Sequence, residues 1–101
     1  MVTKEENIRL IFGLKIRQLR IDQHLSQAEV AQKAGISVSY LNEIEKGKKY
    51  PKANKIAALA TALQVSYDWL VSLQLNQKLA PLAEIINSDI LASLPLEMFG
   101  I

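Results

Sequence analysis

Lysine side chains crowd one short stretch of the sequence, where five lie within ten residues: Lys46, Lys48, Lys49, Lys52 and Lys55. An ammonium group binds phosphate oxygens as a point charge, so this density indicates a polyanion partner such as nucleic acid. Charge clusters are often only a solvated surface, and that alternative stays open for these lysines. Their position directly behind a short polar segment, residues 37–43, favours the nucleic-acid interpretation.

The polar segment offers side chains that could contact base edges: Ser37, Val38, Ser39, Asn42 and Glu43. Asparagine can pair with adenine through two hydrogen bonds, glutamate accepts from the cytosine amino group, and valine meets the thymine methyl. Arginine, which makes the commonest specific contact with guanine, is missing from the set. We therefore expect modest direct reading of bases, with two copies of the chain needed for a selective site. Glu43 could instead form a weak surface pair with a lysine.

The sequence lacks the residue types and spacing of a catalytic or metal site. It has no cysteine, and its single histidine, His24, has no companion at metal-ligand spacing. Paired carboxylates and a nucleophile with its base are absent as patterns. We expect no enzyme activity, no metal and no cofactor, and we interpret His24 as a surface residue at the end of a helix.

Charge is distributed unevenly along the 101 residues. Residues 1–66 contain eleven Lys and Arg against six Asp and Glu, whereas residues 67–101 contain one against four. The basic part suggests a polyanion partner and the acidic part a different role. No apolar run approaches the roughly 18 residues of a membrane span, and the first residues lack the apolar segment of a signal peptide. We expect a cytoplasmic protein with no membrane partner.

Helical periodicity accounts for every segment, so the sequence predicts an all-α fold with five helices in its first two thirds. The T-x-x-E pattern at Thr3 and the S-x-x-E pattern at Ser26 are capping boxes that begin helices. We expect helices at 4–23, between Ser26 and Gly35, between Ser37 and Gly47, at 53–63 and at 67–73. The apolar stripes that should form the core are Ile8, Phe12, Ile16, Leu19, Val30, Ala31, Ala34, Leu41, Ile44, Ile56, Leu59, Ala60, Leu63, Tyr67, Trp69 and Leu70.

We divide the chain into a domain at residues 1–73 and a helical tail at residues 74–101. The tail is apolar and acidic, and we expect either a dimerisation segment or the start of a second domain. Its candidate dimer contacts are Leu75, Leu79, Leu82, Ile85 and Ile86.

Two short helices that meet at Gly35 have the pattern of a helix-turn-helix, in which the second helix is presented outward. Gly35 is expected to turn in the left-handed conformation. Ala31 is expected to be small because the two helices approach most closely there. The segment LRIDQHLSQAEVAQKAGISVSYLNEIEKGKKYPKANKIAALATALQVSYDWL resembles the phage-repressor-type (Xre, Cro-like or lambda-repressor-like) helix-turn-helix domain. Its L-S-Q, A-G-I-S and Y-L-x-x-I-E-x-G motifs carry the resemblance.

The resemblance implies roles for individual residues. Gln27 matches the position that binds a DNA phosphate, and Tyr40 lies near the sugar-phosphate edge, where contact with DNA and burial in the core are equally open. The loop expected to contact phosphates contains Lys46, Lys48, Lys49 and Lys52. Arg20 and Glu45 match a structural ion pair that ties the first helix to the third.

A sequence-specific, DNA-binding transcriptional regulator is the function that the resemblance implies. We expect it to bind a palindromic operator as a homodimer, with the third helix in the major groove and half-sites about 10 base pairs apart. The alternative is a helical protein-interaction module, such as an antitoxin or adaptor, that keeps the fold without using the groove face.

Overall fold

The computed structural model describes residues 4–72 of the chain, and within them every regular element is a helix. The helices are α1 (Lys4–Asp22), α2 (Gln27–Ala34), α3 (Val38–Glu45), α4 (Ala53–Leu63) and α5 (Tyr67–Val71). The prediction of five helices is confirmed, and the bounds agree to within two residues. The Thr3 capping box and the helical tail at 74–101 lie outside the described residues.

Serine side chains begin three of the helices, and the cap at Ser26 is the one that its S-x-x-E pattern predicts. Ser26 and Glu29 form the reciprocal capping box of α2, with Ser26 Oγ 3.0 Å from the Glu29 amide and Glu29 Oε1 2.9 Å from the Ser26 amide. The hydrogen bond from the Ser26 amide is the main reason that the pKa of Glu29 is lowered. Ser37 and Ser66 cap α3 and α5 through Tyr40 and Trp69 amides at 3.0 Å. These caps fix where each helix starts.

Left-handed residues follow four of the five described helices and reverse the chain. Gly35 (φ 70°) follows α2 and Gly47 (φ 77°) follows α3, where glycine takes this conformation without strain. His24 (φ 57°) and Gln64 (φ 60°) are also in the left-handed region, although neither is a glycine. The sequence did not predict these two conformations. His24 is exposed, as expected.

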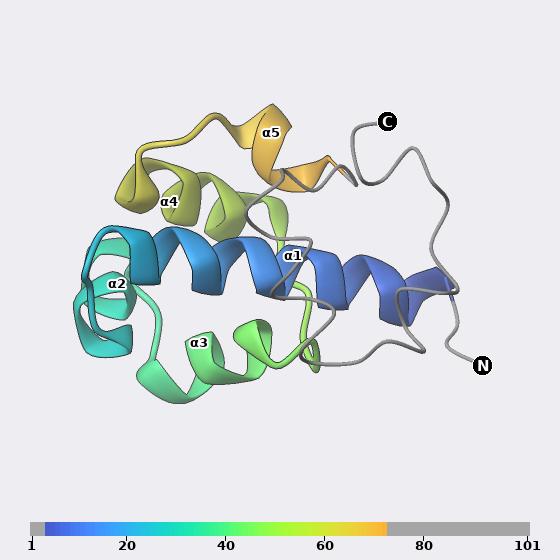
Figure 1. The fold of residues 1–101 in the computed structure, drawn as a ribbon, viewed down its shortest axis with the longest axis horizontal. Helices are drawn as coiled ribbons and strands as arrows, with labels where there is room; N and C mark the ends of the chain where they lie inside the picture. Colours follow the sequence, from blue (N-terminus) through green and yellow to red (C-terminus); the bar gives the residue numbers. More distant parts are fainter. Residues whose placement is uncertain (1–3, 73–101) are drawn as a thin grey trace.

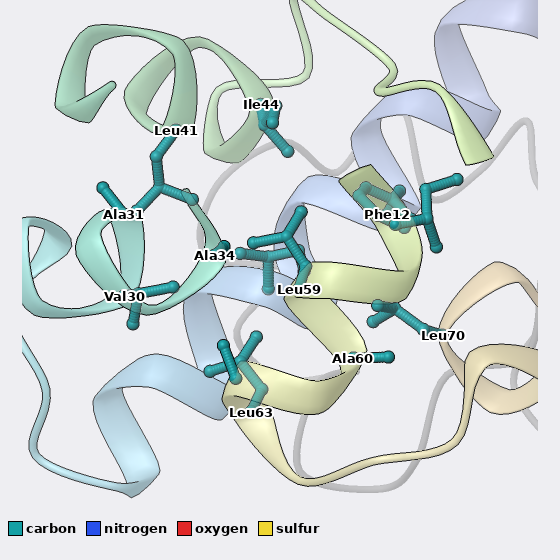
Figure 2. Close-up of a cluster of buried hydrophobic side chains, with 13 residues drawn as sticks. Phe12, Val30, Ala31, Ala34, Leu41, Ile44, Leu59, Ala60, Leu63 and Leu70 are labelled. Atoms are coloured by element: carbon teal, nitrogen blue, oxygen red, sulfur yellow. The ribbon is translucent and has the colours of Figure 1, made fainter. Parts of the chain in front are cut away.

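Helix α1 runs through the middle of the domain, with α4 and α5 on one side and α3 on the other (Figure 1). Helix α2 packs on both α4 and α3. All five helices contribute to one apolar cluster, part of which is shown in Figure 2. Its buried members are Phe12, Ile16, Val30, Ala31, Ala34, Leu41, Ile44, Ile56, Leu59, Ala60, Ala62, Leu63 and Leu70. Most of the predicted core residues are in this cluster, while Ile8, Leu19 and Trp69 are half-buried.

The prediction that Tyr67 belongs to the core is wrong. Tyr67 is 39% exposed, whereas Leu70, three residues later, is completely buried. Helix α5 has only five residues, so one narrow face reaches the core and the first residue after the Ser66 cap lies outside that face. Trp69 packs against the edge of the cluster.

Gly13 lets α1 approach α3 at backbone distance. A methyl group built on Gly13 would overlap the carbonyl oxygens of Ile44 and Glu45, at the C-terminal end of α3. Glycine inside a helix costs about 1 kcal/mol relative to alanine, so packing, not helix propensity, explains this residue. The contact fixes the separation between the two helices, and no local pattern in the sequence indicated it.

Lys15 holds the C-terminal end of α5 against α1. Its side chain is completely buried, and Nζ donates to Trp69 O at 2.8 Å, Ser72 O at 2.7 Å and Ser72 Oγ at 2.8 Å. The ammonium group also lies 4.4 Å from the centre of the Trp69 ring. Burial lowers the pKa of Lys15 from 10.5 to about 8. The amine thus replaces water at the helix end, where carbonyl groups lack helical partners.

Candidate nucleic-acid interface

The turn between α2 and α3 is built as the helix-turn-helix pattern predicts. The Gly35 and Ile36 amides donate back to carbonyls of the last turn of α2, with Ile36 N 3.0 Å from Ala31 O. Ala31 is 1% exposed, and Leu41 and Ile44 attach α3 to the core. The inner face of α3 is therefore fixed, and its other face lies on the outside of the domain (Figure 1).

The first turn of α3 presents side chains to solvent. Ser37 and Ser39 are exposed, and Val38 is one of the few large apolar residues with a high exposed fraction, 45%. Glu43, one turn further along, is half-buried. Tyr40 is also half-buried and packs against the core cluster, so part of the ring serves the fold. An exposed valine between two serines on a rigid helix can contact another surface without any rearrangement.

The lysine loop, residues 46–52, follows α3 directly and is anchored to the domain. Tyr50 contacts the ring of Phe12, with ring centres 5.0 Å apart, and Pro51 is buried. Arg9 Nε donates to Gly47 O at 3.3 Å. Burial raises the pKa of Tyr50 above its usual value. The four lysines that are predicted to contact phosphates are all exposed to solvent: Lys46, Lys48, Lys49 and Lys52.

Four side chains form a hydrogen-bonded network between α1, α2 and α3. Arg20 Nε lies 2.7 Å from Glu45 Oε2, and Arg20 Nη2 lies 3.0 Å from Glu45 Oε1, which makes the ion pair bidentate. Gln27 Nε2 donates both to Glu45 Oε1 at 3.1 Å and to Asn42 Oδ1 at 3.2 Å. The network joins the start of α2 to the middle and end of α3.

A polar pocket of about 260 Å³ opens beside this network. Its lining residues are Arg17, Arg20, Gln27, Asn42, Glu45 and Lys46. The structure thus separates Asn42 from the first turn of α3 and groups it with Gln27 and Lys46. Arg17 was missed in the sequence, although its spacing of three residues from Arg20 places both on one face of α1.

Within residues 4–72 we find no cluster of three His, Cys, Asp or Glu side chains that could hold a metal ion. None of the helices described is long and apolar enough to span a bilayer. The exposed serines, Val38 and lysines offer hydrogen bonding, apolar contact and attraction for an anionic partner.

A family model described as helix-turn-helix, HTH_3, matches residues 16–70, which is more than half of the chain. The chain belongs to this helix-turn-helix family, and the resemblance to phage-repressor-type domains is confirmed. This family is one of transcription-regulator domains and is not a family of enzymes. The match begins inside α1 and ends in α5, so it includes both the network and the lysine loop.

Curated relatives with similar sequences are named as regulators. The chain is 38% identical over 58 residues to the transcriptional regulator ClgR of Mycobacterium tuberculosis, covering 57% of this chain and 52% of that protein. It is 35% identical over 60 residues to the control protein C.BamHI of Bacillus amyloliquefaciens, covering 58% of this chain and 74% of the relative. The chain thus corresponds to about half the length of ClgR.

Solved structures share the fold. The restriction-modification controller protein C.AhdI from Aeromonas hydrophila has a TM-score of 0.59 and 34% identity, covering 61% of this chain and 94% of the other. The clp gene regulator ClgR from Corynebacterium glutamicum has a TM-score of 0.63 and 26% identity, covering 84% of this chain and 86% of the other. The all-α, five-helix architecture is therefore that of a known class of regulator domain.

Proposed function

We propose that this protein is a transcriptional regulator that binds double-stranded DNA by placing α3 in the major groove. One observation carries the proposal: the first turn of α3 is exposed, and the helix is followed directly by a loop of exposed lysines. The names of the relatives, which include a control protein and the immunity repressor of Bacillus phage phi105, support it. Such a protein would work in the cytoplasm, where bacterial DNA is accessible.

Two sets of residues divide the work in this proposal. Base edges would be contacted from the exposed and half-exposed side of α3, by Ser37, Val38, Ser39, Asn42 and Glu43. Phosphates would be bound by the lysine loop and by the N-terminal end of α2 at Gln27, since helix N-termini favour anions. Tyr40 would lie at the edge between them. Because the base-contacting set is weak, lysines supply much of the affinity and DNA shape some of the selectivity.

A homodimer on a palindromic operator completes the proposal. A single α3 with this set of side chains reads too few bases for a selective site, and two copies double the number of contacts. The candidate dimer contacts, Leu75, Leu79, Leu82, Ile85 and Ile86, lie outside the described residues. Sedimentation of the chain shortened to residues 1–73 against the full chain tests their part, because unchanged dimerisation would remove it.

Salt titration of binding to a random-sequence duplex tests DNA binding itself. A protein that neutralises phosphates loses affinity with a slope of about −0.9 per phosphate on a log–log plot. We expect Lys48→Gln with Lys49→Gln to reduce the slope by about 2 and to leave base preference unchanged. Ser39→Ala with Glu43→Ala should change base preference and keep the slope. Binding that ignores salt would overturn the proposal and favour a protein-interaction module.

A further inference from the structure

The Glu45 carboxylate fixes the polarity of the side-chain network. A carboxylate only accepts hydrogen bonds, so the Gln27 atom 3.1 Å from Glu45 Oε1 must be the amide nitrogen. The second hydrogen of that nitrogen then goes to Asn42 at 3.2 Å, and the Asn42 atom that receives it must be the oxygen. Asn42 is left with its NH2 group, which carries two further hydrogens for donation.

The same argument changes what Gln27 can do. Both hydrogens of its side-chain amide are used by Glu45 and Asn42, so the group that remains is a carbonyl oxygen. A carbonyl oxygen cannot donate to a phosphate. Any donation by Gln27 to an anion must come from its backbone N–H, whereas the side chain orients Asn42.

Positive charge is in excess around the pocket beside Asn42. Arg20 is held by Glu45 and by the Leu25 carbonyl at 3.0 Å, and its charge is balanced by the carboxylate. Arg17 and Lys46 also line the pocket, are exposed, and have no carboxylate partner in the described part of the chain. Two uncompensated cations and one amide donor surround a single opening, which suits an anionic oxygen ligand.

We infer that Arg17, Lys46 and the Asn42 NH2 group bind one phosphate of the DNA backbone beside α3, with Gln27 as a positioning residue. This inference rests on the proposed function and deepens it, because it adds Arg17 to the interface and removes Asn42 from the base-reading set. Arg17 lies on α1, Asn42 on α3 and Lys46 directly after α3, and the separation of the two helices is fixed at Gly13. The pocket therefore sets the distance of the DNA backbone from α1 as well as from α3.

Arg17→Gln, compared with Lys33→Gln, tests the cation. Lys33 is exposed on α2, does not line the pocket, and loses the same charge. We expect Arg17→Gln to reduce the salt slope on a random duplex by about 0.9 and Lys33→Gln to leave it unchanged. Equal effects of the two variants would overturn the inference while the proposed function survived. An unaltered full chain without any duplex binding would instead overturn the proposed function, and the inference with it.

Asn42→Asp tests the amide, because it keeps the oxygen that accepts from Gln27 and replaces the NH2 group by an anionic oxygen. Affinity should fall at least about tenfold, by the same factor for random duplexes and for a site selected by the unaltered chain. The base preference obtained by repeating the selection should not change. A changed preference at one base pair, with unchanged affinity for random duplexes, would restore Asn42 to base reading and overturn the inference.

A double-mutant cycle in DNA affinity tests the positioning role of Gln27. If Gln27 acts through Asn42, Gln27→Met and Asn42→Ala each weaken binding, and the combined variant is no weaker than Asn42→Ala alone. A residue that only stabilises the fold would lower the thermal midpoint and give additive losses of affinity. Additive losses would therefore remove Gln27 from the inferred arrangement.

Discussion

Helix α1 attaches α3 and α5 by the same device, a cation, in two different settings. Arg20 reaches α3 through a bidentate pair with Glu45, and the two side chains are 15% and 4% exposed. Lys15 reaches α5 without any carboxylate, and its completely buried ammonium group is surrounded by two carbonyl oxygens, a hydroxyl and an indole ring. In the contact with α3, the carboxylate of Glu45 neutralises the charge of Arg20. In the contact with α5, the charge of Lys15 is stabilised only by the dipoles of neutral groups.

The difference shows which attachment depends on conditions. Removing one member of an ion pair leaves a buried charge without its partner, so the α3 attachment fails abruptly when either residue is lost. An ammonium group held by dipoles carries a desolvation penalty that can be relieved by losing a proton. The α3 contact, which positions the candidate interface, therefore depends on both partners being present, and the α5 contact responds to pH.

Gly13→Ala should have the largest effect, since it attacks the α1–α3 contact at the backbone. The added methyl group meets carbonyl oxygens that cannot move independently of α3, and we expect a loss of about 3 kcal/mol in the free energy of unfolding. Helix propensity alone predicts a gain of about 1 kcal/mol. The sign of the measured change in the free energy of unfolding therefore decides between the packing contact and helix propensity. Gly35→Ala is the control: no atom lies within 4 Å of its added methyl group, so only the left-handed strain of about 1–2 kcal/mol remains. Urea unfolding measures both.

Glu45→Ala should come next, at about 2–3 kcal/mol, because Arg20 and Gln27 lose their shared acceptor. Combining it with Arg20→Met should recover part of the loss, since the uncompensated charge is then gone. A double variant as unstable as the sum of the single ones would show that the two residues do not interact, and the comparison between the two attachments would lose its first half.

Lys15→Met should cost less, about 1–2 kcal/mol near pH 7, because the lost hydrogen bonds are partly offset by the removal of a buried charge. The folded chain releases the Lys15 proton near pH 8, whereas the unfolded chain keeps it to about pH 10.5. Between these values the unfolded state binds more protons, so the stability of the unaltered chain should rise with pH relative to Lys15→Met. Unfolding curves from pH 7 to pH 10.5, with Lys33→Met as the control, measure this rise. A difference that stays flat with pH would contradict the buried-ammonium account.

Ser72→Ala should have the smallest effect, about 0.5–1 kcal/mol, because it removes one of the three oxygens around the Lys15 amine. The reduced solvation of the ammonium group by the protein should also move the rise in stability to lower pH. Thermal unfolding at pH 7 and pH 9 separates these two results. An unchanged pH dependence would mean that the two carbonyl oxygens alone hold the amine.

Local signals in the sequence predict most of the fold. The capping serines and the left-handed glycines act within a few residues, so the roles of Ser26, Ser37 and Gly35 follow from their immediate neighbours in the chain. Those of Gly13 and Lys15 do not, because their partners lie more than 30 residues away. A glycine and a lysine within the otherwise apolar run 10–16 of α1 were the only hints.

The sequence predicted which individual residues of the candidate site are exposed, but it did not predict which of them lie together. Exposure of Val38 and the lysines follows from helix periodicity and loop composition. The position of Asn42 depends on Gln27, which reaches it from α2 and is itself held by Glu45, whereas residue type alone favoured base reading. Arg17 shares a face of α1 with Arg20, but that spacing alone does not show that the two line one pocket with Asn42.

The backbone contact at Gly13 has a consequence for how such a scaffold can diversify. Because main-chain atoms set the spacing of α1 and α3, substitutions on the outward side of α3 leave the placement of that helix untouched. Exchanging Val38, Ser39 and Glu43 for the corresponding side chains of another member should transplant that member's target preference without refitting the interior. The outward side chains of α3 can then change during evolution while the packing of α1 against α3 stays the same.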